Sequence, residues 1–286
     1  MGLIKCPICE INYIQDNEDA CEVCKPKPKE GYKIYANGRE IKLPKPKAEG
    51  NIAFKCNYCD GGKDDTQIGY ARVCTKENIK ENIIVKKRTW CSDGKCQCAR
   101  YLKGILPYDQ IQNDCYESRM LIDWKASAGE NLTDNGDRSK NRKLSKDVSG
   151  GLCVLTAITP EMKEEKERLI FGVFLSDKFE EGEDGLFSGF VQCTTDYKIK
   201  LAPDEAKQIL FWNYYHNQTD QETVGWSSGL FRYIDNYQCA QILRDIVVVK
   251  VGTADEKQAK KLLKKYCELK NIDIAIIPKN NGALMR

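Results

Sequence analysis

Histidine is nearly absent from this sequence: His216 is the only one among 286 residues. With no second imidazole, a His-rich metal site is excluded, and other side chains must bind any metal. The sequence also has no run of eighteen apolar residues, which excludes a membrane-spanning helix. Residues 1–5 do not begin the long apolar core of a signal peptide. These absences predict a cytoplasmic protein without membrane contact, whose thiols stay reduced.

Cysteine, by contrast, is abundant, with fifteen residues of which eleven fall in the first 115. The first four form two Cys-x2-Cys turns, Cys6/Cys9 and Cys21/Cys24. Such a turn brings two sulfurs to one ion, and a second turn completes the tetrahedral shell that Zn²⁺ prefers in structural sites. Two disulfides are the alternative, but the Cys-x2-Cys spacing suits them poorly and no export signal is present. The pattern predicts a structural zinc ion at these four thiolates.

A second group of seven cysteines follows: Cys56, Cys59, Cys74, Cys91, Cys96, Cys98 and Cys115. Cys56 and Cys59 repeat the Cys-x2-Cys spacing, and Cys91 with Cys96 is their natural partner pair. Cys98 competes for the same position. We therefore predict a second zinc site among these five residues and about two zinc ions per chain.

Two questions about this second group stay open. Cys74 and Cys115 are either further ligands or ordinary buried thiols. An iron–sulfur cluster is the alternative to zinc, although the Cys-x4-Cys-x-Cys order of residues 91–98 fits no standard ferredoxin spacing.

Positive charge is concentrated in the first half of the chain. Residues 1–150 carry 27 basic and 22 acidic side chains, whereas the whole chain carries 45 and 42. Between residues 72 and 103 there are nine basic and three acidic side chains. Lys86, Lys87 and Arg88 stand together in this stretch, and they are the predicted contacts to the phosphates of a nucleic acid, with DNA the expected partner. The alternative is a solvated basic face.

Composition changes along the chain predict five segments. They are a four-cysteine zinc module at 1–30, a Pro/Lys-rich spacer at 31–49, a second basic zinc module at 50–133, a polar linker at 134–150 and an α+β domain at 151–286. Within the spacer, Asn37-Gly38 between alternating residues predicts a β-hairpin.

The last segment alternates β-branched and aromatic runs with helix-start signals. Strands are expected at 152–159, 168–175, 189–195, 197–201 and 246–249. Helices are expected to begin at Pro203, Asp235 and Thr253, and residues 272–277 to form a strand or a packed tail. The fold class predicted is α+β with a small twisted or barrel-like sheet.

Aromatic residues are densest between 211 and 233. Rings that stack on bases need hydrogen-bonding neighbours, and Trp226, Arg232 and Tyr233 provide both, so this segment is a candidate base pocket. We expect Trp226 to face the ligand and Trp212 to lie in the core. The alternative is that half of these rings seal a core beneath the helix that starts at Pro203.

Acidic residues offer a competing, enzymatic interpretation. Asp109, Glu117, Asp123 and Lys125 resemble the carboxylate and lysine set with which a nuclease binds Mg²⁺ and activates water. Residues 110–120 favour a helix, however, and a continuing helix would separate Asp123 from Lys125. His216 is a further candidate, as a general base.

The Cys6/Cys9/Cys21/Cys24 and Cys56/Cys59 turns resemble bacterial zinc-ribbon and zinc-knuckle modules. The strands at 151–159 and 168–175 are similar to the barrel strands of PUA-like domains, which include the EVE, YTH and SRA readers of modified bases. This second resemblance implies that a flipped base stacks in an aromatic pocket. The sequence therefore predicts a zinc-binding protein that recognises nucleic acid, with a role in restriction or phage defence by analogy. A Mg²⁺-dependent nuclease and a protein–protein adaptor are the alternatives.

Overall fold

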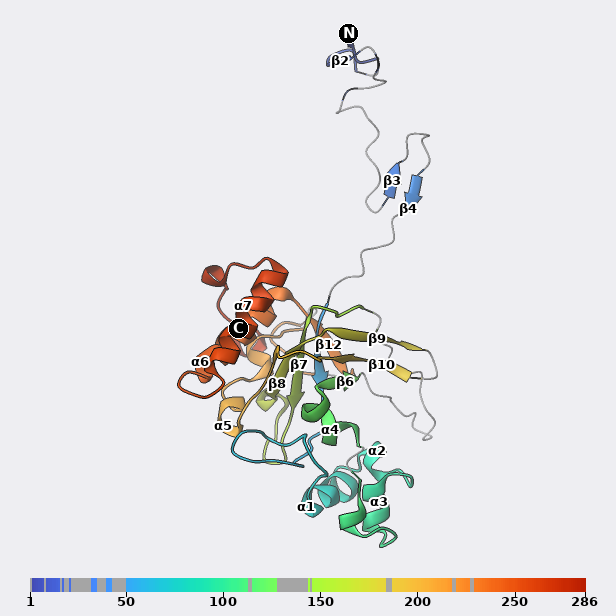
Figure 1. Cartoon of the computed structure of the whole chain (residues 1–286), viewed down its shortest axis with the longest axis vertical. Helices are drawn as coiled ribbons and strands as arrows, with labels where there is room; N and C mark the ends of the chain where they lie inside the picture. The colour runs from blue at the N-terminus through green and yellow to red at the C-terminus, as the bar shows by residue number, and fades with distance from the viewer. Residues whose placement is uncertain are drawn as a thin grey trace. The chain divides into compact units, whose positions relative to one another are not determined.

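The computed structural model describes residues 2–7, 9–15, 17, 21, 32–34, 40–42, 50–112, 115–127, 144, 146–183, 187–217, 220–226 and 229–286. The chain divides into two compact units, residues 1–47 and residues 48–286. Each unit is described by itself below (Figure 1). Most of the predicted polar linker at 134–150 and much of the Pro/Lys-rich spacer lie outside the described residues.

The first unit contains two small antiparallel ladders. β1 (Leu3–Lys5) pairs with β2 (Tyr13–Gln15), and Ile4 lies opposite Ile14. β3 (Tyr32–Ile34) pairs with β4 (Glu40–Lys42). This second pairing confirms the predicted hairpin, whose Asn37-Gly38 turn lies outside the described residues.

A five-stranded sheet organises the second unit, in the order β11-β8-β7-β5-β12. Its strands are β5 (Asn51–Lys55), β7 (Leu152–Ala157), β8 (Leu169–Leu175), β11 (Lys198–Lys200) and β12 (Phe231–Ile234). β5 and β7 run parallel, whereas the other neighbours are antiparallel. A smaller sheet has the order β6-β10-β9, from β6 (Lys125–Ser127), β9 (Lys178–Glu183) and β10 (Phe187–Gln192).

The central strands are apolar because both of their faces are covered. Every residue of β7 and of β8 is buried. Helices α5, α6 and α7 lie on one side of the large sheet and the β6-β10-β9 sheet lies on the other (Figure 1). A strand covered on both faces needs a continuous apolar run, as in Leu169-Ile-Phe-Gly-Val-Phe-Leu175, rather than an alternating one.

Helices and sheets are therefore combined as an α+β fold, as predicted. Neither sheet closes on itself among the described residues, so the expected barrel is not formed. The predicted boundary between 50–133 and 151–286 also needs correction. β5 pairs with both β7 and β12 inside the sheet, and residues 48–286 form one compact unit. A short strand whose partners lie more than a hundred residues away along the chain leaves no local signal of that pairing.

The second unit has seven α-helices among its described residues: α1 (Lys76–Lys80), α2 (Thr89–Ser92), α3 (Gln97–Leu102), α4 (Tyr116–Asp123), α5 (Pro203–Ala206), α6 (Asn236–Val249) and α7 (Glu256–Lys270). A π-helical turn, η1 (Glu81–Val85), follows α1 directly. Short 3₁₀ turns occupy Tyr108–Gln110, Glu165–Glu167, Phe211–Asn213, Ile274–Ile276 and Ala283–Met285. We call residues 74–115, which contain α1 to α3, the helical lobe.

The predicted helix starts are confirmed at α5 and α6. The third predicted helix is present as α7, but it begins at Glu256 after Asp255 rather than at Thr253, and its N-terminus has no side-chain cap. The strand predicted at 246–249 is wrong. Those residues form the last turn of α6, where Ile246 is buried and Val248 is 65% exposed. This short run of β-branched residues continues an amphipathic helix. The free energy gained by burying one face of that helix exceeds the preference of these residues for a strand. Residues 274–276 form a 3₁₀ turn rather than a strand.

Asn51 joins four elements at the edge of the core. Its buried side-chain oxygen accepts hydrogen bonds from the backbone of Leu152 at 2.9 Å and from the hydroxyl of Tyr266 at 3.1 Å. Its amide donates to the side chain of Asn236 at 2.9 Å. β5, β7, α6 and α7 thus meet at one satisfied polar group, which fixes how the helices sit on the sheet.

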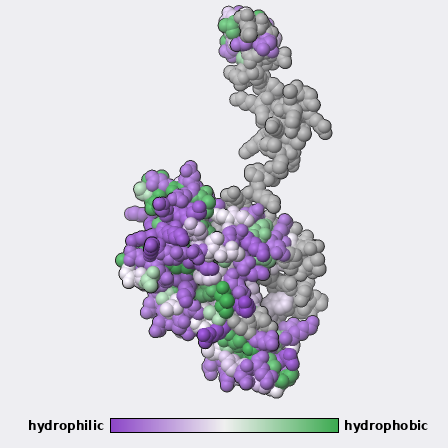
Figure 2. Space-filling model, in the orientation of Figure 1, coloured by the Kyte–Doolittle hydropathy of each residue, from purple (hydrophilic) through white to green (hydrophobic). Residues whose placement is uncertain are grey.

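Hydrophilic residues predominate on the face shown in Figure 2, with separate apolar patches between them. Among the described residues, no helix has both the length and the apolar character needed to cross a bilayer.

Candidate metal centres

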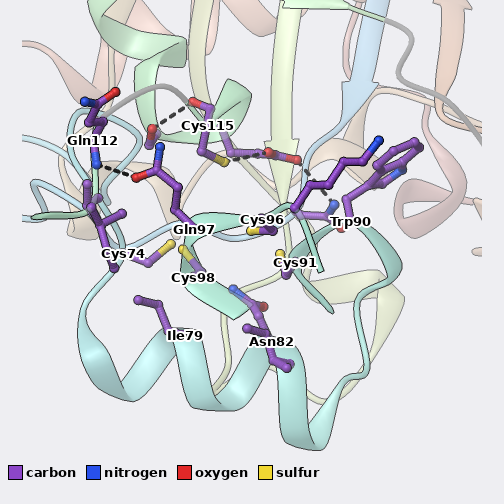
Figure 3. Close-up of a pocket in the computed structure, with 17 residues that line it drawn as sticks. Cys74, Ile79, Asn82, Trp90, Cys91, Cys96, Gln97, Cys98, Gln112 and Cys115 are labelled. Atoms are coloured by element: carbon purple, nitrogen blue, oxygen red, sulfur yellow. Dashed lines mark hydrogen bonds between the residues drawn. The ribbon is translucent and has the colours of Figure 1, made fainter. Parts of the chain in front are cut away.

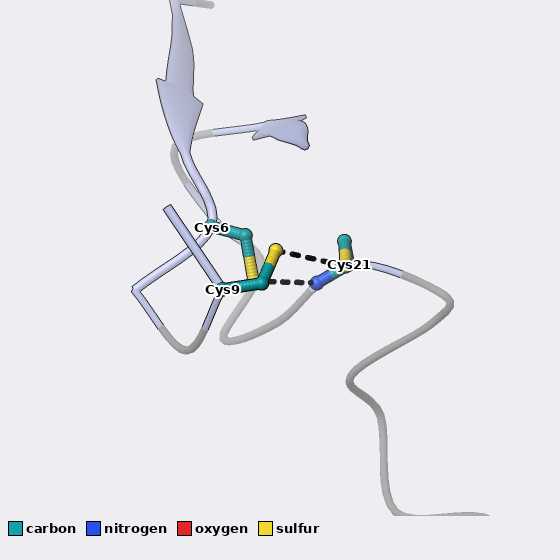
Figure 4. A group of neighbouring side chains, drawn as sticks. All are labelled: Cys6, Cys9 and Cys21. Atoms are coloured by element: carbon teal, nitrogen blue, oxygen red, sulfur yellow. Dashed lines mark hydrogen bonds between the residues drawn. The ribbon is translucent and has the colours of Figure 1, made fainter. Parts of the chain in front are cut away.

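The first unit gathers three of its predicted ligands. The sulfur atoms of Cys6, Cys9 and Cys21 all lie within 4.8 Å of one another (Figure 4). The Sγ atoms of Cys9 and Cys21 are 3.8 Å apart. Four sulfurs bound tetrahedrally at about 2.3 Å from one zinc ion lie about 3.8 Å apart, so this pair has the spacing of a zinc tetrahedron. Cys24, the predicted fourth ligand, lies outside the described residues.

The turn between β1 and β2 positions these sulfurs. The backbone amide of Glu10, which has a left-handed φ of 55°, donates to the carbonyl of Cys6 at 2.8 Å. The amide of Cys21 donates to the Sγ of Cys6 at 3.2 Å, and the side chain of Asn12 donates to the Sγ of Cys21 at 3.3 Å. Such donors stabilise negative charge on sulfur, which suits thiolates that bind a cation.

The second predicted zinc set is not brought together in the same way. Cys56 extends the sheet through its backbone amide, and its thiol contacts the Sδ of Met120 at 3.6 Å. The Cys59 thiol is buried against the carbonyl of Arg72 and the thiol of Cys74.

Among the described residues, only Cys6, Cys9 and Cys21 form a group of three or more His, Cys, Asp or Glu ligand atoms within 4.8 Å of one another. The Cys56/Cys59 turn therefore does not complete a four-thiolate site with Cys91 and Cys96.

A cavity of about 280 Å³ in the helical lobe collects the remaining thiols (Figure 3). Cys74 precedes α1, Cys91 lies in α2, Cys96 and Cys98 lie at the start of α3, and Cys115 precedes α4. All five line the cavity. We call it the five-cysteine cavity.

Burial and mutual proximity govern the acid–base behaviour of these thiols. Burial raises the pKa of the Cys91 thiol to about 12, and the charges of Glu117 and Cys96 act in the same direction. Burial likewise raises the pKa of Cys115. Cys96 behaves in the opposite way, because a hydrogen bond with Cys98 lowers its pKa to about 6. Crowded, desolvated thiols exchange their protons for a cation when one is offered.

The basic residues of the helical lobe lie on its surface. Lys87 is exposed, whereas Lys86 and Arg88 are half-buried. The Nζ of Lys86 is 3.8 Å from a carboxylate oxygen of Glu81. The neighbouring Val85, at the end of η1, is 67% exposed. Of the three predicted phosphate contacts, Lys87 is thus the one whose side chain is exposed to solvent.

The predicted aromatic pocket is instead part of the core. Trp226 is only 2% exposed, and its ring centroid lies 4.8 Å from that of Phe211 and 6.3 Å from that of Trp212. The Arg232 side chain donates to the backbone of Trp226, and the hydroxyl of Tyr233 accepts from the backbone of Lys146. The expectation that Trp226 faces a ligand is corrected: its ring lies in the core, as was expected of Trp212, and Tyr233 packs against that core partly buried.

The carboxylates of the nuclease alternative do not converge in the described part of the chain. Arg119 holds the Asp123 carboxylate through two hydrogen bonds of 2.8 and 2.9 Å. The Nζ of Lys125 lies 3.6 Å from the ring centroid of Phe190. Glu117 lines the five-cysteine cavity, while Asp109 is exposed on a 3₁₀ turn.

His216 is half-buried, and its Nδ1 lies 3.5 Å from the guanidinium of Arg286. A general base is usually oriented by a carboxylate or paired with a nucleophile. Because the neighbour of this ring is a cation, its surroundings do not favour a role as general base.

Comparison with protein-family models, with curated proteins and with solved structures gave no match.

Sequence reasoning left the roles of Cys74 and Cys115 open and did not place them in one cavity. They are far apart along the chain and carry no metal-site spacing, and only the packing of α1, α3 and α4 brings them to one space. The one sequence signal was the density of cysteine itself, which exceeds the need of a single four-ligand site.

Proposed function

We propose that this protein binds zinc through its first unit and recognises nucleic acid through the helical lobe of its second. Zinc is favoured at Cys6, Cys9, Cys21 and Cys24 because the 3.8 Å separation of the Cys9 and Cys21 sulfurs matches a zinc tetrahedron. An ion with four protein ligands has no open position for a substrate, so its role is structural.

The observation that supports nucleic-acid binding is the exposed basic surface around Lys87. Nine basic and three acidic side chains between residues 72 and 103 give this segment an excess of positive charge. Such a surface attracts phosphates without regard to base sequence. Trp90 is 38% exposed, two residues after Arg88, and in this proposal it takes the place of the buried Trp226 as the ring that stacks on a base.

The test measures the binding of double-stranded DNA to the full chain by fluorescence anisotropy at several salt concentrations. Lys87→Ala should weaken binding to every sequence tested and reduce the slope of log Kobs against log salt by about one unit, because one phosphate contact is lost. Lys264→Ala on α7, at an exposed lysine outside the lobe, is the matched control and should leave affinity and slope unchanged. Equal salt slopes for Lys87→Ala and the wild-type protein would refute the proposal.

A further inference from the structure

The five-cysteine cavity is a built site rather than a chance grouping. Four separate segments of the helical lobe each place at least one thiol on its wall, and the labelled sulfurs in Figure 3 face a common space. Ile79, Ile83 and Ile111 complete an apolar lining. Cys74, Cys91, Cys96 and Cys98 are half-buried on this wall, whereas Cys115 is exposed. Solvent exposure is one of the properties by which proteins set the potential of a metal centre.

The separation of the thiols argues against a single ion. The sulfurs of a tetrahedral zinc site stand as close together as those of Cys9 and Cys21 in the first unit, which are 3.8 Å apart. No three ligand atoms of the cavity lie within 4.8 Å of one another, because the first unit holds the only such group among the described residues. The five thiols therefore line a cavity and do not converge on one position where a single ion could contact three of them. A polynuclear cluster fits that geometry, since metal and sulfide ions stand between its terminal thiolates.

The thiols occupy four independent positions on the wall. Cys96 and Cys98 are two residues apart at the start of α3 and both line the cavity, so we count them as one position. Cys74, Cys91 and Cys115 supply the other three positions. We propose that this cavity binds a 4Fe–4S cluster through Cys74, Cys91, Cys115 and one thiolate of the Cys96/Cys98 pair. Four thiolates are the ligand set that such a cluster requires.

One neighbour of Cys74 suits a thiolate bound to a cluster. The side-chain amide of Asn78 lies 3.4 Å from the Cys74 Sγ and donates to it, whereas the Cys74 thiol itself donates to the sulfur of Cys59 at 3.3 Å and would lose that proton on binding a metal. Hydrogen bonds to ligating sulfur are one of the ways in which a protein sets the potential of an iron–sulfur cluster. Lys95 and Glu117 both line the cavity, and the Glu117 carboxylate accepts from the Cys115 thiol at 3.5 Å, so the charges of these two side chains oppose each other.

The first experiment measures iron, zinc and acid-labile sulfide in the full chain, purified without oxygen and incubated with ferrous iron and sulfide. We expect about four iron and about four sulfide ions per chain, with a brown colour and broad visible absorbance. A colourless protein without sulfide after this treatment overturns the proposal, whatever the variants do. The iron and sulfide content does not depend on DNA binding. A protein without the cluster would therefore refute this inference and leave nucleic-acid binding untouched, and a loss of DNA binding would not refute the cluster.

The second experiment assigns the ligands. Cys74→Ser, Cys91→Ser and Cys115→Ser should each lose most of the iron and sulfide, and so should Cys96→Ser combined with Cys98→Ser. Either of the last two substitutions alone should retain the cluster, because the other thiol occupies the same position.

Cys193→Ser is the matched control, since its sulfur lies beside the hydroxyl of Thr195 in the core and away from the cavity. It should retain full iron and sulfide. Variants at Cys74, Cys91 and Cys115 that are folded by circular dichroism and keep the wild-type iron content would overturn the assignment.

Discussion

The indole of Trp226 is held by charge as well as by packing. The guanidinium carbon of Arg168 lies 4.9 Å from its ring centroid, and that of Arg232 lies 5.6 Å away. Arg168 is itself only 2% exposed and is paired with Glu165. Cation–π contacts are strongest where water is excluded, so this ring stabilises a buried cation as well as the aromatic cluster.

Replacement of Trp226 should therefore affect stability rather than ligand binding. We expect Trp226→Ala to lower the free energy of unfolding by about 3–5 kcal/mol, as should Trp212→Ala, because each leaves a large cavity in the core. Chemical denaturation monitored by circular dichroism measures this change.

The control for these two variants is Tyr237→Ala, at a ring that is 48% exposed. It should change the free energy of unfolding by no more than about 0.5 kcal/mol, because surface substitutions remove little packing. A fully stable Trp226→Ala protein with reduced affinity for DNA would restore the base-pocket interpretation.

At the scale of an element, α6 connects the sheet to the C-terminal helices. Its first turn is closed by a capping box: the Asp235 carboxylate accepts from the backbone of Gln238 at 2.8 Å, and the Gln238 side chain accepts from the backbone of Asp235 at 3.0 Å. Its buried face runs through Cys239, Ile242 and Ile246. Capping and one-sided burial together explain why the helix continues through three consecutive valines.

Removal of the cap should weaken this helix measurably. Asp235→Ala should lower the free energy of unfolding of the second unit by about 1 kcal/mol, because the backbone N–H of Gln238 loses its side-chain partner and the box is broken. Urea titration followed at the far-ultraviolet helix signal provides the measurement. Asp273→Ala is the comparison, since Asp273 caps only a short 3₁₀ turn near the surface. An effect of Asp235→Ala no larger than that of Asp273→Ala would contradict the role given to the box.

At the scale of the molecule, the two units obtain their stability from different sources. Apart from its cysteines, the described residues between 2 and 21 of the first unit have Ile14 as their one buried apolar side chain. The second unit has a continuous core that extends from β5 to α7. We therefore expect the first unit to depend on the proposed metal ion, because in a unit with a small core the free energy of metal binding supplies the free energy of folding.

Loss of the first metal should accordingly leave the second unit intact. Cys9→Ser should remove about one zinc ion per chain and the ordered structure around β1 and β2, while the main thermal transition stays at the wild-type temperature. Zinc analysis and differential scanning calorimetry test both parts. The neighbouring Ile11→Ser, at a side chain that is 77% exposed, should retain the zinc. A main transition that moved with zinc content would show that the units fold together.

By itself, the sequence determined the features that depend on near neighbours along the chain. The Cys6/Cys9 turn, the hairpin around residues 32–42, the apolar strands β7 and β8 and the start of α6 all follow from spacing, turn chemistry or capping within a few residues. The excess of thiols and of basic residues in the first half was equally visible in the sequence.

Only the tertiary structure decided the features that depend on distant partners. It placed β5 between β7 and β12, buried Trp226 and turned Cys56 toward Met120. It also brought Cys74 and Cys115 to the wall of one cavity. The spacing of residues along the chain indicates which of them a single turn can bring into contact. It does not report which surfaces pack, because packing is decided by the burial of whole faces whose residues lie far apart in sequence.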